Sequence, residues 1–235
     1  MECQQAQYNG TANLEAMEQA VRYNEFLYGL LRASIRPGSR VLDFGAGLGM
    51  LARRIAADPV LAVDDLVCVE PDDALRARLV TSGLAARRSL EDVKGEFDLA
   101  YTFNVLEHIE DDRAALAGLF RVLKPGGRLL VYVPAFAVLF SAMDRKVGHV
   151  RRYIRRELVE RCQSAGFEVE SALYADSFGF LASLWLRAFG NTSGELNPRL
   201  VSLYDRFIFP ISRMLDRLTG RLFGKNVTLR ARRPH

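Results

Sequence analysis

A glycine-rich turn between an apolar segment and a helix-forming segment constrains the fold of this chain more than any other feature. Residues 41–49 have the sequence Val-Leu-Asp-Phe-Gly-Ala-Gly-Leu-Gly, and residues 50–57 favour a helix. Glycine lacks a Cβ atom, so it adopts positive φ angles readily and lets backbone N–H groups approach a bound molecule. The pattern therefore predicts a strand, a ligand-binding turn and a helix in succession.

Two carboxylates accompany this turn. Asp43 precedes the glycines, and Glu70 ends a second apolar segment about 20 residues further on, where a carboxylate can accept hydrogen bonds from a ribose diol. The alternative for Glu70 is an exposed charge at a strand end. Dinucleotide sites usually have the glycine spacing G-x-G-x-x-G, whereas these glycines have the spacing G-x-G-x-G. Asp72 and Asp73 are expected to cap the helix that starts near residue 74.

Further landmarks follow in a fixed order between residues 85 and 135. They are Ser-Leu-Glu at 89–91, Asn-Val-Leu-Glu-His-Ile at 104–109 after an apolar segment, and Lys-Pro-Gly-Gly at 124–127 before another. With the glycine turn, they resemble motif I and the later landmarks of the class I S-adenosylmethionine-dependent methyltransferases. The whole chain resembles the bacterial type 11/12 group, including members similar to those of cell-surface glycan and lipid pathways.

The resemblance implies a cofactor, a reaction and a set of cofactor contacts. The cofactor is S-adenosyl-L-methionine, and the reaction is methyl transfer to an oxygen or nitrogen of a small-molecule, lipid-linked or glycan-linked acceptor. The implied cofactor-binding residues are Asp43, Gly45, Ala46, Gly47, Gly49, Glu70, Pro71, Leu90, Glu91 and Asn104.

Strand-like and helix-like segments alternate along the chain, which predicts βα units and a parallel sheet. Strands are expected near residues 40–44, 66–70, 85–88, 97–103, 128–134, 168–174 and 227–232. The expected fold is α/β and Rossmann-like, with a seven-stranded, mainly parallel sheet, helices on both faces and a helical insertion before the last strand. A single domain, 1–235, would comprise cap helices (1–35), a cofactor-binding core (36–175), the insertion (176–226) and a last strand with a tail (227–235).

The segment 143–153 is rich in groups that transfer protons or bind anions. It follows the fifth predicted strand, at the strand ends where open α/β sheets bind ligands. Its pattern D-x-x-x-x-H-x-R-R-Y also resembles a signature of one methyltransferase branch. We predict a substrate loop in which His149 is a general base or orienting group and Tyr153 a donor or stacking surface, with substrate-binding Asp144, Arg151 and Arg152. The alternative is a loop fastened by Asp144–arginine or His149–Asp144 hydrogen bonds.

His108 lies in the turn after the fourth predicted strand, near the expected position of the transferred methyl group. It is a candidate proton acceptor, and the alternative is a structural or pocket-lining role. The histidines, cysteines and acidic residues show no metal-site spacing in the sequence. We therefore expect no metal and activity that survives EDTA.

Two other functions were weighed. A nucleic-acid methyltransferase would carry a base-binding sequence such as Asn-Pro-Pro-Tyr after the fourth strand, where this chain has Asn104-Val-Leu-Glu. A catalytically silent regulatory protein that only binds the cofactor would keep the same glycine turn. The first is disfavoured by the residues, and the second is open.

Location was inferred from the ends and the cysteines of the chain. The N-terminus lacks the basic start and apolar stretch of a signal peptide, and no apolar run is long enough to span a bilayer. Cys3, Cys68 and Cys162 form no C-x-x-C pair and are expected to be reduced thiols. These features predict a cytoplasmic protein, with the inner face of the membrane as an alternative site.

The insertion carries both apolar and basic residues. Residues 178–189 are nearly all apolar, and residues 199–235 contain nine lysines and arginines against two aspartates. This combination is typical of a peripheral membrane contact or a lid over an apolar substrate. The alternatives are a solvated basic face, and a helical pair that packs on the core or across a homodimer.

Overall fold

The computed structural model describes residues 11–63, 65–189 and 197–235. Within them the strands form one seven-stranded sheet of order β3-β2-β1-β4-β5-β7-β6. The strands are β1 (Arg40–Phe44), β2 (Asp65–Val69), β3 (Ala85–Arg87), β4 (Phe97–Phe103), β5 (Leu123–Pro134), β6 (Glu168–Ala175) and β7 (Asn226–Arg232). All seven predicted strands are present.

The sheet is parallel except at β7. β1 pairs in parallel with both β2 and β4, whereas β7 runs antiparallel between β5 and β6. The strand order therefore reverses between β1 and β4, which is where open α/β sheets bind ligands beyond the carboxyl ends of the strands. Phe44 and Phe103 end the two strands at this point. The predicted Rossmann-like arrangement is confirmed.

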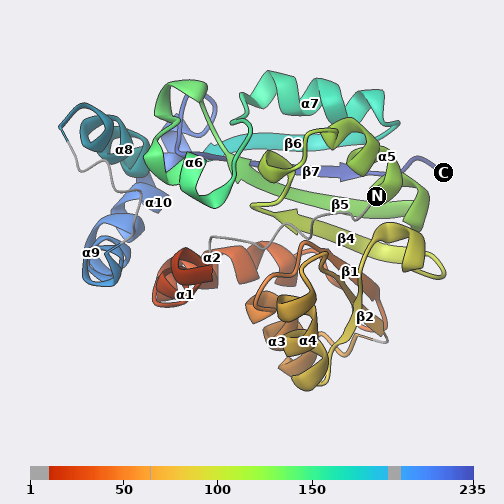
Figure 1. Ribbon diagram of the computed structural model, residues 1–235. Helices are drawn as coiled ribbons and strands as arrows, with labels where there is room; N and C mark the ends of the chain where they lie inside the picture. Colours follow the sequence, from red (N-terminus) through yellow and green to blue (C-terminus); the bar gives the residue numbers. More distant parts are fainter. Residues whose placement is uncertain (1–10, 64, 190–196) are drawn as a thin grey trace, which may run out of the picture.

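Helices cover both faces of the sheet (Figure 1). They are α1 (Thr11–Glu18), α2 (Val21–Arg32), α3 (Met50–Ala57), α4 (Asp73–Thr81), α5 (Asp112–Val122), α6 (Ala142–Val147), α7 (Arg155–Ser164), α8 (Ser177–Phe189), α9 (Pro198–Leu203) and α10 (Phe209–Thr219). Short helical turns are η1 (Leu90–Asp92), η2 (Leu106–His108), η3 (Ala137–Leu139) and the π-helical η4 (Tyr204–Ile208). One core packs α5 and α7 on the sheet, and another packs α2 and α3 on the opposite face.

Local signals fix the ends of several helices. The Asp72 carboxylate accepts a hydrogen bond from the Leu75 N–H at 2.9 Å and so caps α4, as predicted. Asp73 is instead the first residue of α4 and pairs with Arg76. Gly166 has a φ angle of +100° directly after α7, a left-handed conformation that favours glycine at a helix end.

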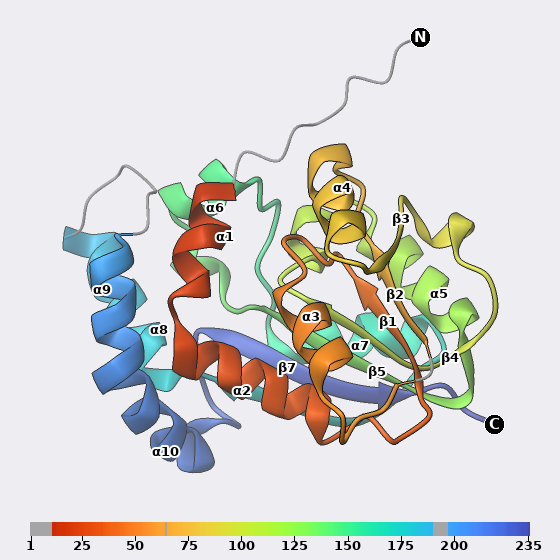
Figure 2. The same ribbon diagram turned by 90° about the horizontal axis from the view of Figure 1, so that it is seen from below.

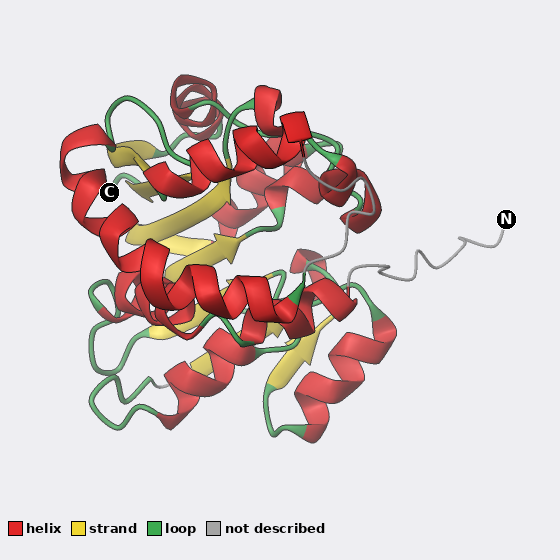
Figure 3. Cartoon of the chain, turned by 90° about the vertical axis from the view of Figure 1, so that its left-hand side faces the viewer, coloured by secondary structure: helices red, strands yellow, loops and turns green. Residues whose placement is uncertain are grey.

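The predicted helical insertion lies between β6 and β7 and consists of α8, α9, η4 and α10. It occupies the side of the molecule that faces the viewer in Figure 3. The Asp216 carboxylate of α10 accepts hydrogen bonds from the N–H groups of Asp176 and Ser177, each at 2.9 Å, so α10 holds the start of α8. Residues 1–10 of the predicted cap segment and 190–196 of the predicted insertion lie outside the described residues.

Membrane span and thiols were two further expectations. In the described ranges, each helix falls short of the length and apolar content that crossing a membrane requires. Cys68 and Cys162 are buried free thiols, and Cys3 lies outside the described residues.

Candidate cofactor and acceptor site

The glycine turn after β1 requires glycine for two separate reasons. Gly45, Gly47 and Gly49 have φ angles of +86°, +54° and +73°, which L-residues with side chains rarely adopt. In addition, a Cβ atom on Gly45 would lie 2.3 Å from Cγ2 of Val105, and one on Gly49 would lie 2.3 Å from Cδ2 of Leu79. The turn therefore closes tightly against the segment after β4 and against α4.

Glu70 follows β2 and holds this turn in place. Its Oε2 accepts a hydrogen bond from the Gly47 N–H at 2.8 Å, and its Oε1 accepts one from the Asp72 N–H at 3.0 Å. The residue is buried, and burial raises the pKa of its carboxyl group while the two N–H donors oppose that rise. A carboxylate has about four acceptor positions, so both oxygens keep capacity for ribose hydroxyls.

Asp43, near the end of β1, is a second buried carboxylate beside the turn. Burial raises the pKa of Asp43 to about 7, and the charge of Glu70 adds to that effect while Tyr101 opposes it. Two carboxylates at the ends of neighbouring strands make the local potential negative. A cationic ligand bound here would favour their ionised forms.

Asn104 forms the turn after β4 on the other side of the reversal point. It has a φ angle of +56°, which asparagine tolerates better than most residues, and its N–H donates to the Tyr132 carbonyl at 2.7 Å. Its side-chain Nδ2 donates to the Tyr23 hydroxyl at 3.3 Å. Burial raises the pKa of Tyr23 to about 12. Sequence reasoning missed Tyr23, because nothing in the spacing of α2 distinguishes it from a core residue.

Tyr23 belongs to an aromatic cluster beside Asn104. Neighbouring rings have centroids 5.7–6.2 Å apart and meet mostly edge to face. The members come from four elements and are Tyr23 and Phe26 of α2, Phe103 of β4, Tyr132 of β5 and Phe209 of α10. The cluster places apolar ring surface next to the reversal point of the sheet.

The loop that contains His149 is fastened to the body of the protein. The buried Asp144 carboxylate lies 2.7 Å from Nδ1 of His149 and accepts hydrogen bonds from Arg152 Nε and Nη2 at 2.8 and 3.0 Å. Burial raises the pKa of Asp144, but these partners outweigh burial and hold that pKa well below its usual range. Asp144 and Arg152 neutralise each other in the interior. Both contacts of the alternative are present, and the substrate-binding role of the two residues stays a prediction.

Tyr153 is also an internal residue. Its side chain is fully buried, and its hydroxyl donates to Oδ2 of Asp112 at 2.6 Å and lies 3.0 Å from the Leu106 carbonyl. The hydroxyl of Tyr153 therefore has internal partners, and its role as a substrate donor or stacking surface stays a prediction. Arg151 is half-buried, with Nη2 donating to the Glu110 carbonyl at 2.8 Å. Its substrate-binding role stays a prediction.

The fold brings together Glu107, His108 and His149, a group that sequence spacing does not reveal. One ligand atom from each lies within 4.8 Å of the others, and His149 Nε2 is 3.8 Å from Glu107 Oε1. Glu107 is fully buried, and burial raises its pKa to about 8. Burial also lowers the pKa of His108 to about 4, with a smaller effect from His149. The expectation of no metal stays a prediction.

Similarity to known proteins decides the family. Residues 18–172, more than half of the chain, match the family model of a methyltransferase domain. The chain belongs to the class I S-adenosylmethionine-dependent methyltransferases. Its cofactor is S-adenosyl-L-methionine.

Individual relatives agree with this assignment. A probable S-adenosylmethionine-dependent methyltransferase of Mycolicibacterium smegmatis is 34% identical over 142 residues, which cover 58% of this chain and 54% of that protein. A ubiquinone/menaquinone biosynthesis C-methyltransferase of Serratia proteamaculans is 30% identical over 193 residues, which cover 75% and 77% of the two chains. The solved methyltransferase from the complex with the Haloferax volcanii Trm112 activator has a TM-score of 0.67 at 14% identity over the full length of both chains, which shows a shared fold.

The charge of the methyltransferase site and the helix that lies over it both fit the cofactor. S-adenosylmethionine carries a sulfonium and an ammonium group, and the carboxylates of Asp43 and Glu70 offset positive charge. Helix α1 lies over the glycine turn, because a Cβ atom on Gly47 would be 3.8 Å from Cδ1 of Leu14 (Figure 2). Helix α1 therefore lies close enough to the turn to cover a ligand bound there.

The four other predicted cofactor residues are Ala46, Pro71, Leu90 and Glu91. Ala46 donates its N–H to the Val69 carbonyl at 3.2 Å, and Pro71 is exposed beside Glu70. Leu90 and Glu91 belong to η1 after β3, where Leu90 is half-buried and Glu91 is exposed. Their contacts with the cofactor stay predictions.

We expect methyl transfer by the purified protein to survive EDTA. A carboxyl group with a pKa of about 8 is mostly protonated at pH 7, so Glu107 offers a cation little charge beside two imidazoles. Activity should be measured before and after chelation, with metal content determined in the same samples. Loss of activity that Zn²⁺ or Mg²⁺ restores would contradict this expectation and make Glu107, His108 and His149 the ion's ligands.

Proposed function

We propose that this methyltransferase transfers a methyl group to an oxygen or nitrogen atom of an apolar small molecule or of a lipid-linked or glycan-linked acceptor. The observation that carries the proposal is the aromatic cluster beside Asn104, in which the rings of Tyr23, Phe26 and Phe103 are half-buried. Ring surface that is still accessible favours apolar acceptors through the hydrophobic effect. The quinone-pathway name of the Serratia proteamaculans relative is compatible with an apolar acceptor, but that relative is a C-methyltransferase and does not support the choice of oxygen or nitrogen.

The residues of the chain act mainly by alignment. The cofactor supplies an electrophilic methyl group on its sulfonium sulfur. Glu70 and the glycine turn hold the cofactor from one side, and Asn104 and Tyr23 lie on its other side. Holding donor and nucleophile in line and excluding water supplies much of the rate enhancement in such displacements.

His149 is our candidate for the group that takes a proton from the acceptor. The short Nδ1–Asp144 contact fixes the orientation of the ring and favours the tautomer with its proton on Nδ1, which leaves the lone pair on Nε2. Asp144 thereby acts as a positioning residue for His149. His108 has its ring centroid 4.6 Å from that of His149 and is proposed as a packing partner.

The acceptor class can be tested with cofactor that carries a labelled methyl group. We expect label from an extract of the native cell to appear in the fraction soluble in organic solvent, and the Glu70→Ala variant to transfer less at a subsaturating cofactor concentration. Label in nucleic acid would overturn the proposal in favour of a nucleic-acid methyltransferase. Normal binding of S-adenosylhomocysteine without any labelled product would favour a silent regulatory protein.

A further inference from the structure

A continuous apolar stripe runs along the outer side of the insertion. Residues 198–219 form one helical run through α9, η4 and α10, about 33 Å long at 1.5 Å per residue. Its exposed apolar side chains recur at intervals of three and four residues, which places them on one side of the helix. Each is 52–81% exposed, and they are Leu200, Leu203, Phe207, Ile211, Met214 and Leu218.

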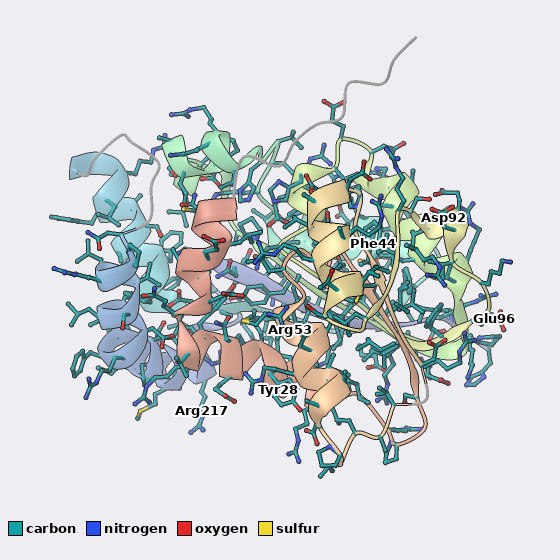
Figure 4. All side chains as sticks on the ribbon, turned by 60° about the horizontal axis from the view of Figure 1, so that its bottom comes forward. Tyr28, Phe44, Arg53, Asp92, Glu96 and Arg217 are labelled. Atoms are coloured by element: carbon teal, nitrogen blue, oxygen red, sulfur yellow. The ribbon has the colours of Figure 1, made fainter. Side chains whose placement is uncertain are left out.

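Arginines border the apolar stripe along its whole length. Each of four exposed arginines comes within one residue of an exposed apolar side chain, and the set comprises Arg199, Arg206, Arg217 and Arg221. Arg213 is instead half-buried, lies over the Phe26 ring and pairs with Asp216. Arg217 lies at the outer margin of the molecule in Figure 4. Lysine and arginine side chains beside apolar residues can extend toward headgroups while the apolar residues enter the acyl boundary.

The two acidic residues within 198–222 point inward. Asp205 is 5% exposed and accepts hydrogen bonds from the N–H groups of Arg22 and Tyr23, each at 2.8 Å. Asp216 has a side chain that is 6% exposed and accepts from two N–H groups at the start of α8. The outer side of this helical run is therefore positive and apolar without exposed acidic residues.

The neighbouring helix α8 also carries exposed apolar side chains. It packs against α10 and carries exposed Leu181, Leu184 and Trp185, the last of which is the only tryptophan of the chain. Tryptophan favours the boundary between water and lipid, because one edge of its ring is polar.

We propose that the apolar stripe and its arginines dock on an anionic phospholipid bilayer, with the helical run lying in the plane of the interface. The complementary charge selects a lipid surface over a second copy of this chain, whose stripe would bring like charges together. Docking goes beyond the proposed function and does not depend on turnover. It also lies near the site, because Phe209 of the same run packs against Tyr23 with ring centroids 5.7 Å apart.

Co-sedimentation with vesicles tests the proposal without cofactor or acceptor. The protein should bind vesicles of phosphatidylcholine and phosphatidylglycerol, bind phosphatidylcholine alone much less, and release as salt rises. Replacing Arg206, Arg217 and Arg221 together with glutamine should weaken binding roughly 100-fold, since each basic residue near an anionic surface contributes about fivefold. The fluorescence of Trp185 should shift to shorter wavelength on binding.

Matched variants keep the result interpretable. The double variant Phe207→Glu, Met214→Glu should abolish binding, whereas Val80→Glu on α4 and Arg156→Gln on α7 alter equally exposed residues elsewhere and should leave it unchanged. All four positions are exposed, so circular dichroism should match the wild-type protein. No sedimentation with anionic vesicles at low salt would overturn the proposal. Equal binding by the stripe variants, or a dimer in solution that those variants dissociate, would overturn it too.

Discussion

Glu70→Ala should lower the affinity for S-adenosylhomocysteine by at least about tenfold. In the structure, Glu70 is buried and already accepts hydrogen bonds from the glycine turn, and its remaining acceptor positions lie at the carboxyl end of β2. Two charge-assisted hydrogen bonds to a ribose diol would be worth about 1.5–3 kcal/mol each, and the loss of either corresponds to at least about tenfold. Loss of the Gly47 contact would add to this by loosening the turn.

Isothermal titration calorimetry is the appropriate measurement for this variant. Glu96→Ala is the matched control, because Glu96 is an exposed carboxylate directly before β4, at the opposite ends of the strands (Figure 4). It should bind the cofactor product as the wild-type protein does. Unchanged affinity in a folded Glu70→Ala protein would remove Glu70 from the cofactor site.

His149→Ala should lower kcat by about 100-fold or more, the usual scale for a positioned acid–base group, while affinity for the cofactor stays near normal. The structure adds a second expected effect. His149 contacts the buried Asp144, so its removal leaves that carboxylate with one partner fewer and should lower the thermal midpoint. Steady-state kinetics with saturating cofactor and a thermal melt measure the two effects separately.

The partner residues distinguish catalysis from fastening. Asp144→Asn should lower both the thermal midpoint and kcat, because it weakens the link to Arg152 and the orientation of His149 together. His108→Ala should disturb cofactor binding or folding more than proton transfer. A fall in stability alone for His149→Ala would leave it as a fastening residue, and a His149→Ala protein that is fully active and as stable as wild type would contradict both roles.

The order of elements could be predicted from the sequence because its signals are local. Alternation of apolar and polar residues, the glycine turn and the cap at Asp72 each depend on a few neighbouring residues. Which polar side chains become buried depends instead on contacts between segments that are far apart in the sequence. Asn104 meets Tyr23 only because α2 crosses the end of β4, and no spacing rule contains that contact.

The site was harder to predict for the same reason. Residues 143–153 were predicted to form a substrate loop, with a loop fastened by its own hydrogen bonds as the alternative, and residue type alone could not choose between the two. The structure buries Asp144 against Arg152 and directs Tyr153 to Asp112. Glu107 and His149 likewise come close only because the segment after β4 meets the segment after β5. In these cases the sequence identifies which reactive residue types are present, but it does not show in which direction their side chains point.

Helix α2 begins without a capping side chain of its own, and Asp205 of the insertion accepts hydrogen bonds from its first free N–H groups. Asp205, whose carboxylate points away from the basic outer surface, is thus the cap of α2, the helix that carries Tyr23. Any displacement of α2 on cofactor binding must move or break this cap. Thermodynamic linkage then requires reciprocity: a surface that stabilises one position of the insertion changes the affinity for the cofactor, and the cofactor changes the affinity for that surface by the same free energy.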